Sequence, residues 1–362
     1  MWLTCSSIGR KFVMAVTGVA LVLFVTFHVL MNSVALIWPT AYNQVCEFLG
    51  ANWYALAASA GLALLFIIHI IYAIWLTLQN RAARGTDRYA VTSRPPQVEW
   101  SSKNMLVLGI VVVAFLIVHL IQFWAKMQLQ EICEAELNTL PQIDGTPCSP
   151  AMGTLFLQMA FSEIWTPIVY IIGFVALWFH MTHGFWSMFH TVGWDNNRWI
   201  NRLKTIGCWW TSIVIVLFIA QALAFTVRAQ SNYYLENEAL QEQYSEFWSQ
   251  KADEVIADFE SRYYALVGQE GDQMQQQQIQ MDFISNELPA YVERAKYISN
   301  AYKQQCGKIA PTAEMQQLER FTSAMEQQIQ MVKMFAKQPA TQQAQQAQPA
   351  ETTPAENQDT NE

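Results

Sequence analysis

The sequence contains few charged residues and lacks two motifs that redox enzymes often carry. Only 14% of its 362 residues are Asp, Glu, Lys or Arg, well below the ~25% of a typical soluble domain. The formal net charge of -8 argues against a nucleic-acid-binding protein, because such proteins carry basic surfaces. The chain also has no Cys pattern for an iron–sulfur cluster and no glycine-rich dinucleotide fingerprint. We therefore expect this chain to bind neither an iron–sulfur cluster nor a dinucleotide.

Long apolar runs take the place of the missing charge. A membrane-spanning helix needs about 20 apolar residues, and five segments of this kind are present. They are 12–37, 53–79, 104–126, 164–189 and 205–227. The first has no Lys, Arg, Asp or Glu and is too long for the apolar part of a signal peptide, so we expect it to remain as a span. The sequence predicts an all-α, polytopic five-helix bundle over residues 1–227.

The remaining third of the chain is polar and rich in Gln and Glu. Segments 232–267, 272–305 and 312–336 have few Gly or Pro and a helical apolar spacing, which predicts a small helical extension over 228–336. Residues 337–362 are rich in Gln, Ala, Pro and Thr and are predicted to be disordered. The extension could cover a site, mediate contacts in a homo-oligomer or bind another protein; the sequence does not choose.

Lys and Arg predict the orientation of the spans, because they concentrate in cytoplasmic loops. One side has ten of them, from Arg10 to Lys204, whereas the other side has only Lys126 and Arg228 at span ends. We therefore expect the chain to lie in a bacterial inner membrane, with its N-terminus on the cytoplasmic side. With five spans, the extension is expected on the periplasmic side.

Four of the spans each carry one histidine deep in an apolar run: His28, His69, His119 and His180. A single such residue is more often a packed core histidine than a ligand. Four, one per span, point to function, because ionisable groups are unfavourable in a bilayer. Neutral imidazole binds metals, and two histidines can hold a haem iron between them. The pattern predicts two b-type haems, each with two histidine ligands.

Depth sorts these histidines into two layers. His28 and His119 lie on outward-running spans, with His28 roughly 24 Å from the cytoplasmic end at about 1.5 Å per residue. His69 and His180 lie on inward-running spans, roughly 15 Å from that end. We therefore expect an outer pair, His28 with His119, and an inner pair, His69 with His180. His183, one turn after His180, could be the ligand instead, but we expect it to be a polar neighbour of the inner haem.

Two short motifs and the histidine order resemble a known family. The opening SSIGRKFVMAVTG, the later FHMTHGFWSMFHTVGW and one histidine on each of the first four spans are similar to the di-haem cytochrome b anchor subunit of succinate dehydrogenases and quinol:fumarate reductases. The resemblance covers about residues 1–227. It implies the same ligand pairs and layers as the depth argument does.

The resemblance further implies partners and a substrate. A flavoprotein and an iron–sulfur subunit would handle succinate or fumarate, and this chain would carry electrons between them and a membrane quinone, expected to be menaquinone. The chain itself would not catalyse the dicarboxylate reaction. In some fumarate-reducing members a glutamate two residues before the fourth ligand moves protons across the membrane. Here that position is Trp178, so the resemblance implies no such proton path.

Glu47 is the candidate proton relay of the quinone site. It is the only carboxylate between the first two spans, and the family resemblance implies a quinone site near the outer haem with a carboxylate. A carboxylate at the membrane interface can exchange protons with quinone when burial raises its pKa. A solvated loop glutamate is an equally good reading of this residue.

Four cysteines, Cys46, Cys133, Cys148 and Cys306, fall on the predicted outer side. Four thiols in an oxidising compartment can pair in three ways. We favour Cys133 with Cys148, which leaves Cys46 with Cys306; unpaired thiols are the alternative.

Two other functions are compatible with these observations. The chain could be the haem b subunit of another respiratory complex, such as a hydrogenase or formate dehydrogenase. It could also be a transporter without redox function, whose histidines carry protons or metal ions. The order of one histidine per span and the SSIGRK opening favour the succinate or fumarate complex over both.

Overall fold

The computed structural model describes residues 6–50, 52–84, 100–133, 140–143, 145–194, 196, 198–268 and 272–336. The predicted disordered tail, 337–362, lies outside these residues. The chain forms two compact units. The first contains residues up to Ser245 together with Lys303–Ile309, and the second contains Glu246–Tyr302 and the chain from Ala310 onward. The structure thus draws the boundary after the predicted one at residue 227.

The five predicted spans are present as five long apolar helices. They are α2 (Ser7–Ile37), α4 (Trp53–Arg84), α5 (Trp100–His119) continued by the π-helix η1 (Leu120–Trp124), α8 (Trp165–Thr191) and α9 (Ile200–Gln230). Several extend beyond the predicted spans because Lys and Arg near the ends stay helical while their charges reach toward water. These helices make the chain a multi-pass, all-α membrane protein, and its environment is a lipid bilayer.

Local sequence explains where these helices begin and end. The hydroxyl of Ser6 accepts a hydrogen bond from the backbone N–H of Gly9 at 2.9 Å, which caps the start of α2. Helix α2 ends at Ile37 and Trp38 is its C-cap, because Pro39 lacks an N–H and disfavours helix in the residue before it. Helix α8 ends before Gly193, whose φ of +80° is the left-handed conformation typical of a C-terminal cap. The glycine of the VGW motif therefore has a structural role.

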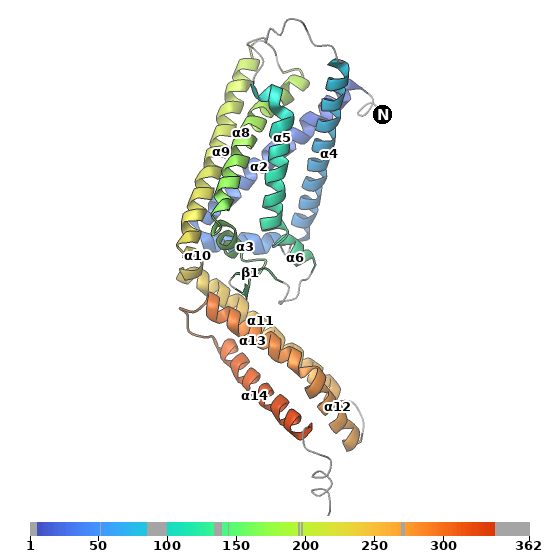
Figure 1. Ribbon diagram of the computed structural model, residues 1–362, viewed down its shortest axis with the longest axis vertical. Coiled ribbons are helices and arrows are strands. Elements are labelled where there is room, and N and C mark those ends of the chain that lie inside the picture. The colour runs from blue at the N-terminus through green and yellow to red at the C-terminus, as the bar shows by residue number, and fades with distance from the viewer. Residues whose placement is uncertain are drawn as a thin grey trace, which may run out of the picture. The chain divides into compact units, whose positions relative to one another are not determined.

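Helices α2 and α8 lie at the centre of the first unit. Helix α8 packs against α9, α5 and α2, and α2 also packs against α4 and α9. The spans lie side by side in Figure 1. Large apolar side chains such as Leu23, Ile67, Ile117 and Val216 point outward and are exposed, as expected for helices that face lipid rather than water.

Short elements close one end of this bundle. They are α3 (Pro39–Gly50), α6 (Gln128–Ile132), the two-stranded hairpin β1 (Gln142–Ile143) and β2 (Thr146–Pro147), α7 (Gly153–Phe161) and α10 (Tyr233–Glu236). Helix α3 lies across the helix ends in Figure 1. The amide oxygen of Asn43 accepts hydrogen bonds from the backbone N–H and the hydroxyl of Thr154, both at 2.9 Å. The Thr154 hydroxyl also lies 2.8 Å from the Tyr244 hydroxyl. This buried network fixes α3 against α7.

Polar groups also join the first and last spans at the same end. The guanidinium of Arg228 donates to the backbone carbonyls of Ala35 and Leu36 at 2.9 and 2.8 Å. These carbonyls belong to the last turn of α2, where a cation also interacts favourably with the helix dipole. Arg228 therefore satisfies two carbonyls that the helix leaves without an internal partner.

The second unit is a helical bundle, as predicted for the extension. It contains most of α11 (Glu238–Val267), with α12 (Gln273–Asn286), α13 (Leu288–Gln305) and α14 (Ala313–Ala336). Its buried side chains include Trp248, Val255, Phe283, Ile298 and Leu318. Ion pairs such as Arg262–Glu287, at 2.9 Å, lie on its surface and add little stability because solvent screens them.

Candidate functional site

The structure brings the four span histidines together in the two pairs that the depth argument predicts. On α2 and α5, the rings of His28 and His119 have centroids 5.8 Å apart and planes at 82°. On α4 and α8, the rings of His69 and His180 are 6.3 Å apart at 61°. All four histidines lie partly buried within the bundle. Each pair therefore presents two imidazoles from two helices across a short gap.

The inner pair, His69 with His180, is bordered by small residues. A Cβ atom added at Gly18 would lie 3.8 Å from Cε1 of His69, and one added at Gly109 would lie 3.8 Å from Cε1 of His180. Each of the four histidines follows a glycine on its own span, namely Gly18, Gly61, Gly109 and Gly173, and two of these glycines thus approach the inner rings. The other two do not: Gly61 faces open space, and Gly173 packs against the ring of Phe115.

The outer pair, His28 with His119, is surrounded by aromatic rings. Phe24 stacks on His28 with a centroid separation of 5.4 Å, and Phe123 lies 5.3 Å from His119. Phe115 and Phe218 each lie 6.1 Å from one of the two imidazoles. These rings make the outer layer more aromatic than the inner one.

One histidine in each layer has a hydroxyl partner at Nδ1. The Thr17 hydroxyl lies 3.1 Å from Nδ1 of His69 and donates its proton to the backbone carbonyls of Val13 and Met14, at 2.9 and 3.1 Å. The Tyr170 hydroxyl lies 3.2 Å from Nδ1 of His119. Because a hydroxyl has one proton, the Thr17 oxygen accepts from the Nδ1–H of His69. The Nε2 atom of a neutral His69 then carries a free lone pair, as a metal ligand requires.

The donor sets fit haem better than a bare metal ion. Each pair supplies two imidazoles, whereas a protein zinc site needs three or four ligands. No group of three or more His, Cys, Asp or Glu suited to a metal ion occurs among the described residues. Two imidazoles on either side of an iron have ring centres about 6 Å apart for metal–nitrogen bonds of about 2 Å, close to both observed separations. The Nδ1 atom of His180 is buried without a hydrogen-bond partner.

Two other residues of α8 that the sequence singles out lie near this layer. The ring of His183 packs on Trp186 with centroids 5.0 Å apart, and it follows His180 by one turn. The indole N–H of Trp178 donates to the hydroxyl of Ser212 on α9 at 2.9 Å. Trp178 thus joins α8 to α9 through this hydrogen bond.

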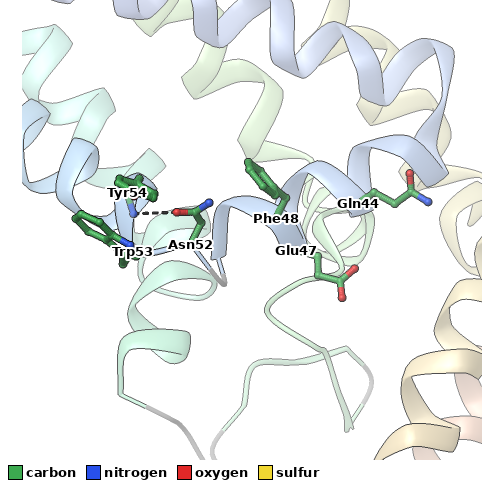
Figure 2. Close-up of a pocket in the computed structure, with 6 residues that line it drawn as sticks. All are labelled: Gln44, Glu47, Phe48, Asn52, Trp53 and Tyr54. Carbon is green, nitrogen blue, oxygen red and sulfur yellow. Dashed lines mark hydrogen bonds between the residues drawn. The ribbon is translucent and has the colours of Figure 1, made fainter.

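Glu47 lies at the end of the bundle that α3 covers. Its exposed side chain lines a surface hollow with Gln44, Phe48, Asn52, Trp53 and Tyr54, as Figure 2 shows. The rings of Trp53 and Tyr54 have centroids 3.8 Å apart, and the Asn52 side chain accepts from the backbone N–H of Tyr54 at 2.9 Å. The hollow therefore combines aromatic faces with amide and carboxylate groups.

The structure adds a second carboxylate at this end, which sequence reasoning missed. Glu131, on α6, is half-buried, and its carboxyl group lies against Gly50 at the end of α3. Burial raises the pKa of this carboxyl from 4.5 to about 7. A carboxyl with a pKa near 7 can both accept and release a proton at neutral pH. Only its position shortly after the third span could have marked Glu131 in the sequence.

The cysteine pairing that we favoured is not present. Cys46, Cys133, Cys148 and Cys306 are all free thiols in the structure. Cys133 is exposed whereas Cys148 is buried, and Cys46 lies against Tyr42 and the Gly153 backbone. Burial raises the pKa of the Cys148 and Cys306 thiols to about 12. These two thiols are therefore poor nucleophiles in the folded protein.

Sequence reasoning also missed the polar residues that surround the histidines. Thr17, Gln122, Thr166 and Tyr170 are all buried in the bundle. Polar side chains within spans tend to hydrogen-bond between helices, so their presence is a usable signal. Their partners could not be predicted, because those partners depend on how the helices pack.

No family model, no curated protein and no solved structure matches this chain.

Proposed function

We propose that this chain is the membrane cytochrome b subunit of a succinate:quinone oxidoreductase complex, a succinate dehydrogenase or fumarate reductase. In this role it carries electrons between an iron–sulfur subunit and a membrane quinone through two b-type haems. The observation that supports this most is the pairing of four span histidines, with ring centroids 5.8 and 6.3 Å apart. The short motifs at residues 6–18 and 179–194 favour this complex over other haem b complexes.

The residues of the chain have distinct tasks in this proposal. His28 and His119 hold the outer haem iron, and His69 and His180 hold the inner one. The haems supply one-electron carriers at two depths of the membrane. The surrounding helices keep the four imidazoles apart from water, while Thr17 and Tyr170 orient His69 and His119. Precise orientation of a ligand by a neighbouring hydrogen bond is typical of metal sites in proteins.

The quinone site in this proposal lies at the end of the bundle covered by α3. Oxidation of a quinol releases two protons, so the site needs a group that accepts them. Glu47 in the aromatic hollow and Glu131 beside Gly50 are the two candidates. The raised pKa of Glu131, about 7, favours it as the proton acceptor, and the hollow that Glu47 lines suits the quinone ring.

The opposite end would meet the iron–sulfur subunit on the cytoplasmic face. Cations border the helix ends there. The guanidinium of Arg10 lies 5.3 Å from the Trp75 ring, and the ammonium of Lys204 lies 4.3 Å from the Trp186 ring. Cations over aromatic rings are typical of the membrane interface. The basic side of the chain is then the cytoplasmic one, where the partner's clusters lie close to the inner haem.

Purification of the intact protein from its membrane, with its associated subunits, tests the proposal. We expect a flavoprotein and an iron–sulfur subunit to co-purify, and succinate or quinol to reduce b-type absorbance bands. A purified protein with no reduced b-type bands would contradict the proposal. A cytochrome that co-purifies only with hydrogenase or formate dehydrogenase subunits would assign it to another complex.

A further inference from the structure

The outer histidine His119 belongs to a hydrogen-bonded chain of four side chains. The Nδ1 atom of His119 lies 3.2 Å from the Tyr170 hydroxyl, and Tyr170 donates to the side-chain oxygen of Gln122 at 2.9 Å. The amide nitrogen of Gln122 donates to the Thr166 hydroxyl at 3.2 Å. Tyr170, Gln122 and Thr166 are all buried, so solvent does not compete for these bonds.

The direction of each bond follows from the donors available. A tyrosine hydroxyl has one proton, and the carbonyl oxygen of Gln122 can only accept it. The Tyr170 oxygen therefore accepts from the Nδ1–H of His119. This leaves the lone pair of His119 on Nε2, the nitrogen that faces away from Tyr170.

The local helix geometry brings Gln122 into this chain. Helix α5 ends at His119, and the next five residues form the π-helix η1. A π-helical turn changes the direction of the side chains that follow it and is frequent at functional sites. It places Gln122, three residues after His119, beside α8, which carries Tyr170 and Thr166.

We infer that Tyr170 is a positioning residue for the outer haem: it holds the His119 tautomer and increases the basicity of Nε2, with Gln122 fixing the direction of the hydroxyl. This inference rests on the proposed function. When the ring nitrogen that does not bind the metal donates its N–H in a hydrogen bond, the other nitrogen becomes a stronger electron-pair donor to the metal. A stronger donor stabilises ferric over ferrous iron and so lowers the reduction potential.

The test is a redox titration of the intact complex that carries Tyr170→Phe. Phenylalanine keeps the ring, which packs against Phe115 and Phe174 with centroids 5.1 and 5.8 Å away, and removes only the hydroxyl. We expect both haems to remain and the midpoint potential of the outer haem to rise. Thr17→Val is the matched control, because it removes the hydroxyl beside His69 and should raise only the potential of the inner haem.

Gln122→Leu provides a second variant in case Tyr170→Phe loses the outer haem. The Tyr170 oxygen remains in this variant but its direction is no longer fixed, so the outer potential should again shift and the inner one should not. The inference is overturned if Tyr170→Phe retains both haems with unchanged potentials, or if Gln122→Leu does. It is also overturned if both haems shift equally. Absence of haem from the unmodified complex would instead contradict the proposed function.

Discussion

The two histidine pairs have similar ring separations but different surroundings. The outer pair is enclosed by aromatic rings, and His119 is joined to three buried polar side chains. The inner pair lies beside Gly18 and Gly109, with one hydroxyl contact to His69 and no hydrogen bond at Nδ1 of His180. The chain thus defines the outer site by hydrogen bonds and the inner site by small residues.

This difference suggests that the two sites have different demands. A haem bound by well-oriented ligands has a potential set by those hydrogen bonds and by burial. The outer layer lies toward the end with Glu131 and the aromatic hollow, where electrons and protons would meet at the quinone. In the proposed function, the inner layer would only accept or pass electrons near a cytoplasmic partner.

Removal of a single histidine ligand should abolish haem binding in its own layer and leave the other layer unchanged. In His119→Ala, we expect the outer haem to be lost and the inner one to remain, because a two-ligand site with one ligand removed binds iron poorly. His180→Ala should show the reverse. Haem content per chain, measured by absorbance, should fall from two to about one in each variant. Retention of both haems in either variant would show that the paired histidines are not the haem ligands.

A similar variant tests whether His180 or His183 is the haem ligand on α8. His183→Ala should retain both haems, because His183 lies beside Trp186 and is not part of a histidine pair. If His183→Ala lost the inner haem while His180→Ala kept it, the inner pair would need to be reassigned.

At the outer end, the two carboxylates should differ. The Glu131 carboxyl, with a pKa of about 7, is ionised above that pH and can then accept a proton from quinol. We expect quinol oxidation to slow as the pH falls below 7, and Glu131→Gln to reduce the rate by about 10²-fold, within the usual range for general base catalysis. The dependence of the quinol oxidation rate on pH near 7 should be absent from the Glu131→Gln variant. Glu47→Gln is the matched control, and a larger loss in that variant would assign the proton transfer to Glu47.

The glycines provide a graded test of the inner site. A leucine at Gly109 would extend from a Cβ position 3.8 Å from the His180 ring, whereas a Cβ added at Gly61 would meet no atom within 4 Å. Gly109→Leu should therefore lower the occupancy of the inner haem and leave the outer one intact. Gly61→Leu should change neither. An equal loss in both variants would indicate a general effect on helix packing.

The smallest expected effect is a response to the membrane potential. An electron that moves between the layers crosses part of the bilayer, and one full charge through 100 mV corresponds to about 2.3 kcal/mol. With Trp178 joined to Ser212, no carboxylate at that position carries a compensating proton. Succinate oxidation in sealed, oriented vesicles should be accelerated several-fold by a potential that is negative inside, and quinol-driven fumarate reduction slowed. If the rates are the same with and without an uncoupler, the placement of the quinone site at the outer end is contradicted.

Much of the membrane unit could be predicted from the sequence because a bilayer restricts the possible structures. Each apolar run must form a helix, and the position of a residue along the run gives its depth. His28 and His119 could therefore be paired without a structure. Depth alone does not reveal which side chains from neighbouring helices meet. The bonds of Thr17 and Tyr170 to their histidines depend on the rotation and packing of the helices, so only the structure shows them.

The residues outside the bilayer were harder to predict. The cysteine pairing relied on loop positions, but Cys148 is buried while Cys133 is exposed. Glu131 lies on the short helix α6, which a turn separates from the π-helix η1, and no periodicity in the sequence places its carboxyl against Gly50. The helical character of the extension was predicted correctly because apolar spacing within a segment is a local signal. The predicted segment 272–305, however, forms two helices, α12 and α13. Contacts between distant segments have no such local signal.

A redox titration of the purified, intact protein, followed by visible absorbance, tests the central claim most directly. If four histidines hold two haems in different surroundings, the b-type bands should reduce in two one-electron steps at different potentials, with equal amounts of haem in each. Two haems per chain would be found by total haem analysis. A single step from one haem per chain, or a protein that carries no haem, would contradict the account.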